Sequence, residues 1–161
     1  MPKGYSRSQI VLHWLTLAVI AWQFIGHDAI SAAWRSLRQG GSPAFDPLVA
    51  GHVAGGIAVL VFAVWRIVLH RRRGAPAPIE GGPAILRPLA KLVHAGLYVA
   101  MIALAVTGGM VWFGGIASAA EVHEVLKAVL LGLIALHVAG ALWHQFVLRD
   151  GLMQRMARPP E

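Results

Sequence analysis

Cysteine is absent from this chain of 161 residues, and charged residues make up only 13% of it. Without cysteine, the sequence excludes disulfide bonds, iron–sulfur clusters and thiolate metal ligands. Any metal site must therefore be built from histidine, methionine or carboxylate side chains. The scarcity of charge, together with a hydrophobic content of 57%, also places the chain outside the usual composition of soluble globular proteins.

What the sequence does contain is four long apolar runs. Each meets the requirement of ~20 residues for an α-helix that crosses about 30 Å of hydrocarbon. Lipid-exposed backbone must satisfy its own hydrogen bonds, so runs of this length predict helices. No small-residue cleavage site follows the first run, which argues against a cleaved signal peptide. We expect one all-α domain over residues 1–161, an integral membrane four-helix bundle with spans near 8–26, 47–69, 89–113 and 122–148.

The net charge of +7 is distributed unevenly around these runs. Basic residues flank the first run, the second connection and the end of the last run: Lys3, Arg7, His70, Arg71, Arg72, Arg73, Arg87, Lys91, Arg149, Arg155 and Arg158. In the other two connections, Arg35 and Arg38 are offset by acidic residues. The positive-inside rule then predicts that both termini are cytoplasmic. Because the basic residues flank membrane spans, we expect no nucleic-acid partner.

The segments between the runs are short. Residues 27–46 form an external loop that contains a candidate interfacial helix at 31–38. Residues 74–88 are rich in proline and glycine and predict an irregular cytoplasmic connector. Residues 114–120 predict a tight external link.

Histidines within the apolar runs form a pattern typical of metal ligands. His123 and His137 are fourteen residues apart, which on a helix is about 21 Å along nearly the same face. His13 and His52 lie near the starts of the first and second runs. A buried imidazole in a membrane span is costly and usually functional. Imidazoles at two levels of a four-helix bundle predict two stacked b-type haems and electron transfer across the bilayer.

Positions along the helices indicate how these histidines pair. His13 lies six residues from Arg7, so it is about 9 Å deep, and His52 lies nineteen residues from Arg71, so it is about 28 Å deep. The difference of roughly 19 Å nearly equals the spacing of about 21 Å between the two histidines of the last run.

The simplest arrangement therefore pairs His13 with His137 and His52 with His123, because it needs a single vertical offset of the last helix. Pairing His13 with His144 would need two different offsets. Two histidines on each iron fill both axial positions, so the predicted chemistry is outer-sphere electron transfer rather than binding of dioxygen.

Two other histidines have simpler interpretations. His27 follows the first run and is expected to be a solvated loop residue. His70 adjoins the basic cluster at the water edge, although its position eighteen residues after His52 makes it a geometric alternative as a ligand. Small residues near the ligands would suit either a flat macrocycle or close helix packing. These are Gly51, Gly55, Gly56, Gly108, Gly109 and Gly140.

With these residues in place, the chain resembles the prokaryotic cytochrome b561 family, and the resemblance covers nearly all four runs. The motifs that carry it are Tyr5-Ser6-Arg7-x-Gln9-Ile10-x-x-His13-Trp14, Gly51-His52, His94 with Tyr98, His123-Glu124, and Leu136-His137 with His144. The resemblance implies a di-haem cytochrome of the bacterial inner membrane. It also implies that the haem ligands are His13, His52, His123 and His137, paired as above.

Bacterial members that this chain resembles act as superoxide:ubiquinone oxidoreductases. The resemblance therefore implies an oxidoreductase that takes electrons from superoxide outside and passes them to ubiquinone near the cytoplasmic side, surrounded by membrane lipid. Related cytochromes are electron-relay subunits of a hydrogenase or dehydrogenase, which would add a redox partner protein. The short external loops favour the stand-alone enzyme. A non-redox membrane protein or transporter is a third interpretation, and an absorption spectrum distinguishes it.

His144 and His94 are candidates for the quinone site. His144 lies seven residues beyond His137, about 10 Å nearer the cytoplasm, and His94 begins the third run on the same side. A neutral imidazole can hydrogen-bond a quinone carbonyl and deliver a proton. A hydrogen bond to a haem propionate or to backbone is the alternative for both.

Arg35, Arg38 and Lys127 are the candidates for steering superoxide on the external side. Lys127 follows His123 by one helical turn and shares its face. Cations near an accessible haem edge would speed the encounter with an anion. Pairing with haem propionates would explain all three residues, and anchoring of the loop at lipid headgroups would explain Arg35 and Arg38.

Overall fold

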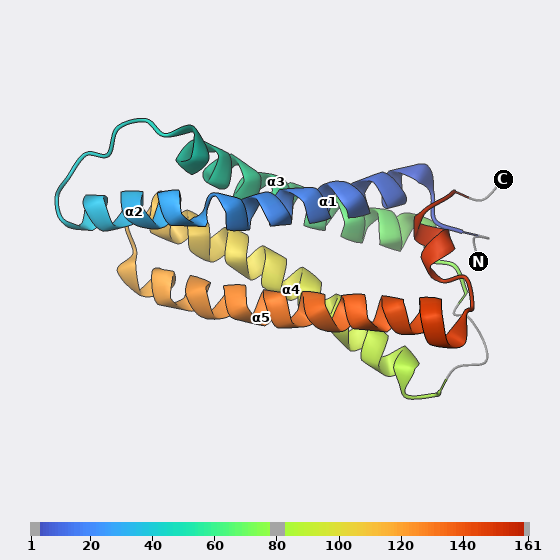
Figure 1. Cartoon of the computed structure of the whole chain (residues 1–161). Helices are drawn as coiled ribbons and strands as arrows, with labels where there is room; N and C mark the ends of the chain where they lie inside the picture. Colours follow the sequence, from blue (N-terminus) through green and yellow to red (C-terminus); the bar gives the residue numbers. More distant parts are fainter. Residues whose placement is uncertain (1–3, 78–82, 160–161) are drawn as a thin grey trace.

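The computed structural model describes residues 4–77 and 83–159, which are almost entirely helical (Figure 1). The α-helices are α1 (Arg7–Ile25), α2 (His27–Arg38), α3 (Pro47–Arg73), α4 (Leu86–Trp112) and α5 (Ala117–Trp143). A π-helical turn, His144–Leu148, continues α5, and a 3-10 turn, Met153–Met156, follows it. No strand occurs within the described ranges.

Four of these helices are long and apolar enough to cross a membrane: α1, α3, α4, and α5 with its π-helical turn. The prediction of an all-α membrane four-helix bundle is confirmed. The helices extend beyond the predicted spans, since α3 continues to Arg73 and α5 already begins at Ala117. Hydropathy marks only the apolar part of a helix. Basic residues in the last turn of α3 are compatible with helix because they interact favourably with its C-terminal dipole.

Local sequence explains where α1 and α3 begin. Ser6 and Gln9 form a capping box, in which the Ser6 backbone N–H donates to the Gln9 side chain at 2.9 Å and the Ser6 hydroxyl accepts from the Gln9 N–H. Asp46 caps α3 by accepting from the Leu48 N–H at 2.7 Å, and Pro47 follows at the first helical position.

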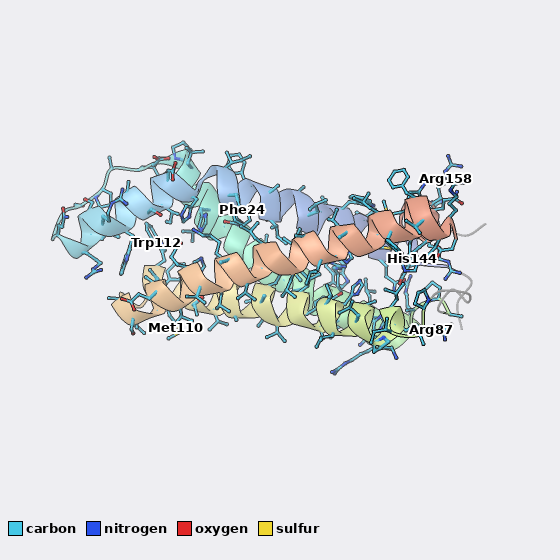
Figure 2. All side chains as sticks on the ribbon, turned by 60° about the horizontal axis from the view of Figure 1, so that its bottom comes forward. Phe24, Arg87, Met110, Trp112, His144 and Arg158 are labelled. Carbon is cyan, nitrogen blue, oxygen red and sulfur yellow. The ribbon has the colours of Figure 1, made fainter. Side chains whose placement is uncertain are left out.

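The helices pack in an order that brings distant parts of the sequence together. α1 packs against α3, α3 against α4, and α4 against α5. Figure 1 shows the N and C labels at the same end of the bundle as the α3–α4 connection, while α2 and the α4–α5 link lie at the opposite end. In Figure 2, Arg87, His144 and Arg158 lie at one end, whereas Phe24, Met110 and Trp112 lie toward the other.

The connecting segments differ from the expectations in three places. The predicted interfacial helix at 31–38 exists, but it begins at His27, so the prediction of a loop position for His27 is wrong. The predicted link at 114–120 is shorter, because α5 has already begun at Ala117. Of the predicted connector at 74–88, residues 78–82 lie outside the described residues, and α4 starts at Leu86.

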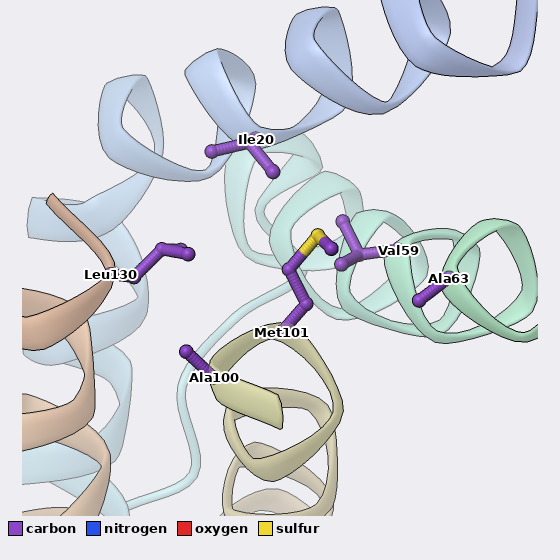
Figure 3. Packing of buried hydrophobic residues seen from close by; sticks show 6 residues of the cluster. All are labelled: Ile20, Val59, Ala63, Ala100, Met101 and Leu130. Carbon is purple, nitrogen blue, oxygen red and sulfur yellow. The ribbon is translucent and has the colours of Figure 1, made fainter. Parts of the chain in front are cut away.

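The buried core occupies the middle of the bundle. Figure 3 shows side chains from α1, α3, α4 and α5 meeting there: Ile20, Val59, Ala63, Ala100, Met101 and Leu130. Many other large apolar side chains are exposed on the outer faces of the same helices, for example Val61 and Trp65 of α3. In a membrane these faces contact lipid, so the core supplies helix packing without covering the outside of the bundle.

Candidate functional site

Two histidines meet near the end of the bundle that carries the chain termini. The imidazole rings of His13 on α1 and His137 on α5 have centroids 6.0 Å apart, with planes inclined at 58°. Two imidazoles on opposite sides of one metal ion would have centroids about 6 Å apart, because a metal–nitrogen bond is about 2 Å long and a ring atom lies about 1 Å from its centroid. The separation therefore suits shared axial ligation of one iron.

His94 of α4 adds a third imidazole at this level. Its ring lies edge-on to that of His137, with centroids 4.9 Å apart. Its Nδ1 lies 2.6 Å from the carbonyl oxygen of Ala90 and must donate to it, which leaves the lone pair on Nε2. The structure thus brings this predicted quinone residue beside a predicted haem ligand.

At the other end, His123 of α5 is oriented by Thr107 of α4. The Thr107 hydroxyl lies 2.8 Å from the Ala103 carbonyl oxygen and 3.1 Å from His123 Nδ1. A hydroxyl has a single proton, and the carbonyl can only accept it, so Thr107 Oγ1 accepts from the Nδ1–H of His123. This leaves Nε2 of His123 unprotonated, which is the tautomer that binds a metal while its second nitrogen is hydrogen-bonded.

His52 of α3 is the predicted partner of His123 at this end of the bundle. Among the described residues, its Nδ1 has no hydrogen-bond partner, and the same holds for both amide atoms of Gln23, although all three atoms are buried. Buried polar atoms are rarely left unpaired. The unpaired amide of Gln23 would therefore suit a bound group with polar atoms at this level.

The glycines near the predicted ligands differ in whether a side chain would fit at their positions. A Cβ on Gly108 would lie 3.2 Å from Cε1 of His123, so the missing side chain lets this imidazole approach α4. A Cβ on Gly51 would lie 3.0 Å from Trp22 Nε1, and one on Gly55 would collide with Gln23, so these two glycines serve close packing of α1 on α3. A Cβ on Gly56, Gly109 or Gly140 would meet nothing within 4 Å.

The donor sets at the two levels suit a metal held in a macrocycle better than a bare ion. Within the described ranges, no group of three or more histidine, cysteine or acidic residues is placed to hold a metal ion. Two imidazoles at each level would complete the coordination of an iron whose other four ligands come from a porphyrin. The residues present therefore fit b-type haem.

Arg66 is a residue that the sequence reasoning missed. It lies within the apolar run of α3, with Nη2 3.1 Å from His13 Nδ1 and Cζ 5.4 Å from the ring centroid of Tyr98. The topology prediction uses only the charges that flank the apolar runs. The sequence feature that could have identified Arg66 is its position several residues inside a predicted span, because charged residues there usually have a function.

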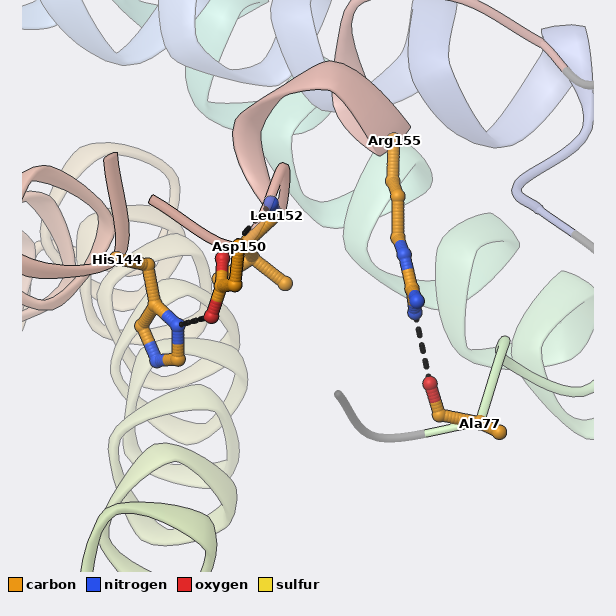
Figure 4. Close-up of polar contacts among 5 residues, drawn as sticks. All are labelled: Ala77, His144, Asp150, Leu152 and Arg155. Carbon is orange, nitrogen blue, oxygen red and sulfur yellow. Dashed lines mark hydrogen bonds and ion pairs between the residues drawn. The ribbon is translucent and has the colours of Figure 1, made fainter. Parts of the chain in front are cut away.

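The candidate quinone residue His144 lies in the π-helical turn after α5. Its Nδ1 is 2.5 Å from Oδ2 of Asp150, as Figure 4 shows. Burial opposes ionisation of Asp150, but hydrogen bonds from His144 and from the Leu152 N–H outweigh it and hold the pKa of this carboxyl below its ordinary value. Among the described residues, no hydrogen bond or ring contact joins His144 to His94.

The segment after His144 covers the terminal end of the bundle. Arg155 donates to the Ala77 carbonyl oxygen at 2.7 Å (Figure 4), and Trp14 Nε1 donates to the Met156 carbonyl oxygen at 2.9 Å. His70, the geometric alternative to the predicted ligands, is exposed in the last turn of α3.

The predicted superoxide-steering cations fall into two groups. Lys127 Nζ is 2.5 Å from the Glu124 carboxylate and 2.9 Å from His27 Nε2, so its charge is already balanced. Arg35 and Arg38 are exposed in the last turn of α2, and neither forms an ion pair within the part of the chain that the structure describes. Among the described residues, the candidate steering cations without an ion pair are therefore the two arginines of α2.

Comparison with known proteins agrees with this geometry. Residues 4–159 match the family described as prokaryotic cytochrome b561. The chain belongs to that family. Its relatives include cytochrome b562 of Cereibacter sphaeroides, which is 33% identical over 97% of this chain and 96% of that protein. The probable superoxide oxidase CybB of Yersinia pestis is 32% identical over 97% of each chain. Cytochrome b561 homolog 1 of Escherichia coli K12 is 27% identical over 94% of this chain and 96% of that protein.

Membership confirms the resemblance seen in the sequence. It identifies the protein as a membrane electron-transfer cytochrome that binds b-type haem. With four helices long and apolar enough to span a bilayer, it is a multi-pass protein of the bacterial inner membrane.

Proposed function

We propose that this cytochrome holds two b-type haems, oxidises superoxide at the external end and reduces ubiquinone at the cytoplasmic end. The ligand pairs are His13 with His137 and His52 with His123. The observation that carries the proposal is the 6.0 Å separation of the His13 and His137 rings, matched one level away by a second pair of histidines on α3 and α5.

The same proposal gives the bundle its orientation. The end with the two chain termini also carries the basic residues around the α3–α4 connection, among them Arg71 to Arg73 and Arg87. The positive-inside rule places this end in the cytoplasm. The His52 and His123 level then faces the external side, and the His13 and His137 level faces the cytoplasm.

The electron balance of the proposed reaction is simple. Two superoxide anions each lose one electron and leave as dioxygen, and one ubiquinone gains two electrons and two protons to become ubiquinol. Bound haem would supply the one-electron carriers, and His13, His52, His123 and His137 would hold it. Other residues of the protein would attract the anion and provide protons for the quinone oxygens.

Protons for ubiquinone would come from the cytoplasmic end. His144 donates its Nδ1–H to the Asp150 carboxylate, so it can donate to a quinone carbonyl only when its Nε2 is protonated as well; that Nε2–H is the proton it would deliver. His94, beside His137, is a second imidazole at this end. Replacing His144 with alanine should leave both haems bound and slow quinone reduction. Unchanged quinone kinetics would remove His144 from the site.

Haem content tests the ligand assignment. The purified protein should carry two equivalents of b-type haem and show the sharp reduced α-band of bis-histidine ligation. His13→Ala and His52→Ala should each remove one equivalent, whereas His70→Ala, a change in an exposed histidine of α3, should remove neither. A wild-type protein with a single equivalent would overturn the di-haem proposal.

A second experiment tests the electron donor. Enzymatically generated superoxide should reduce the purified protein with no partner present, and a ubiquinone analogue should reoxidise it. Superoxide dismutase, added as a control, should abolish the reduction. If superoxide does not reduce the protein although a chemical reductant does, the chain is instead an electron-relay cytochrome for a partner dehydrogenase or hydrogenase.

Charge replacement tests the steering role of α2. Replacing Arg35 and Arg38 together with glutamine should lower the rate of reduction by superoxide roughly tenfold at low ionic strength, and less at high salt, because the effect is electrostatic. Replacing Arg72 and Arg73 with glutamine changes the net charge equally at the other end of the bundle and should leave the rate unchanged. Equal effects of the two double variants would exclude local steering.

A further inference from the structure

Arg66 places a positive charge inside the membrane-spanning part of α3, five residues before Arg71. A cation at this depth is costly unless it meets an anion or strong hydrogen-bond acceptors. No carboxylate in residues 4–77 and 83–159 lies within 4.0 Å of its guanidinium. The ring centroid of Tyr98 lies 5.4 Å from the guanidinium carbon, but a phenol supplies no carboxylate.

The contact between Arg66 and His13 also leaves a conflict of hydrogen bonding. A guanidinium can only donate, so a 3.1 Å contact between Arg66 Nη2 and His13 Nδ1 requires the Nδ1 lone pair. A neutral imidazole then carries its proton on Nε2, which cannot bind iron in that form. Ligation through Nε2 instead puts the proton on Nδ1, as already found for His123, and removes the acceptor from Arg66.

The two conditions are met together if the acceptor arrives with the iron. We infer that Arg66 binds a carboxylate of the haem held by His13 and His137, one of its two propionate groups. This inference rests on the proposed function. A planar guanidinium matches a carboxylate through two parallel hydrogen bonds, which makes arginine better suited than lysine to this role. The ring of Tyr98 holds the guanidinium from its other side by a cation–π contact.

The pairing has an electrical consequence for the cytoplasmic haem. A positive charge fixed beside it favours the reduced iron, which carries one positive charge fewer than the oxidised iron. Loss of that charge should shift the reduction equilibrium of this haem toward the oxidised form by about tenfold, which corresponds to about 59 mV for one electron. The external haem, whose proposed ligand His52 lies fourteen residues before Arg66 on α3, should be unaffected.

The test measures both midpoint potentials of the purified holoprotein by spectroelectrochemistry. Arg66→Gln should lower the potential of the cytoplasmic haem by the amount above, Arg66→Lys should recover part of it, and Arg71→Gln should change neither haem. Arg71 is the matched control because it is an exposed arginine at the same end of α3. Haem content, measured in parallel, should show that both equivalents remain in Arg66→Lys.

A haem with esterified propionates separates carboxylate binding from a simple effect of charge. Wild-type protein should bind the free acid of iron protoporphyrin about tenfold more tightly than its dimethyl ester at the cytoplasmic site, and Arg66→Gln should lose most of this preference, because the carboxylate and the guanidinium stabilise binding only as a pair. If Arg66→Gln keeps the wild-type preference for the free acid, the guanidinium binds another anion, such as a lipid phosphate, and the inference is overturned.

The remaining outcomes are also decisive. If Arg66→Gln does not accumulate, the affinities for the free acid and the ester are compared in wild type and in Arg66→Lys, and equal affinities for the two haems in wild type would overturn the inference. A potential unchanged in Arg66→Gln, in a protein that still binds two haems, refutes the role of Arg66 while the proposed function stands. A wild-type protein with fewer than two haems refutes the proposed function itself.

Discussion

Thr107→Val is the sharpest test of how the bundle controls its external haem ligand. The change replaces a hydroxyl with a methyl group of similar size, so packing on α4 is nearly conserved. It removes the acceptor 3.1 Å from His123 Nδ1 and leaves that N–H unpaired inside the bundle. An unpaired buried donor costs about 1–3 kcal/mol, and loss of such an outer partner typically weakens metal binding about 10–100-fold.

Two measurements follow from this. Transfer of haem from the purified protein to an excess of a soluble haem-binding acceptor should become about 10–100-fold more favourable for one of the two haems. The midpoint potential of that haem should rise, because His123 without its hydrogen bond is a less basic ligand and stabilises oxidised iron less. The haem between His13 and His137 should retain both its affinity and its potential.

The chain offers a matched control in Thr16 on α1. Its hydroxyl is buried and donates to the Leu12 carbonyl oxygen at 2.5 Å, and it has no hydrogen bond to a histidine. Thr16→Val therefore removes a buried hydroxyl without touching a ligand, and Thr107→Ser restores the acceptor. If Thr16→Val and Thr107→Val weaken haem binding equally, or if serine fails to rescue, the assignment of Thr107 as the residue that orients His123 is refuted.

Two further predictions use other contacts. Gly108→Val should lower the content of external haem severalfold, because the valine side chain would press on His123. Gly109→Val should not, since a Cβ there meets no described atom within 4 Å. Equal losses of haem in the two variants would contradict the role of Gly108. Asp150→Asn should lower the Tm by a few degrees at pH 7, because it removes a charge-assisted hydrogen bond with His144. The pKa of Asp150 is lower in the folded protein than in the unfolded chain. The Tm difference between wild type and Asp150→Asn should therefore be present above about pH 4 and disappear as the pH falls through the pKa of the folded protein. A Tm difference independent of pH would contradict this prediction.

The histidine spacing was informative because it depends on helix geometry alone. A separation of fourteen residues between His123 and His137 fixes two levels on one face of α5, whatever α5 packs against. The offset argument favoured His137 over His144 as the neighbour of His13, and the rings of His13 and His137 have centroids 6.0 Å apart. The finer assignment of ligands remains a proposal, tested by haem content.

Other features could not be predicted because they depend on which helices are neighbours. Thr107 and His123 are sixteen residues apart on different helices, and nothing local marks the threonine as their shared contact. Lys127 looked like a free cation until Glu124 and His27 were found beside it. Arg66 was visible in the sequence, but its significance came from its distance to His13.

The membrane-spanning helices, the family and the two levels at which imidazoles occur could be predicted from the sequence, because apolar length and helical rise are properties of single segments. The folded structure was needed to learn which nitrogen of His123 is free, which charges are already paired and where Arg66 lies. Those answers depend on contacts between side chains from different helices, and such contacts exist only after the helices have packed.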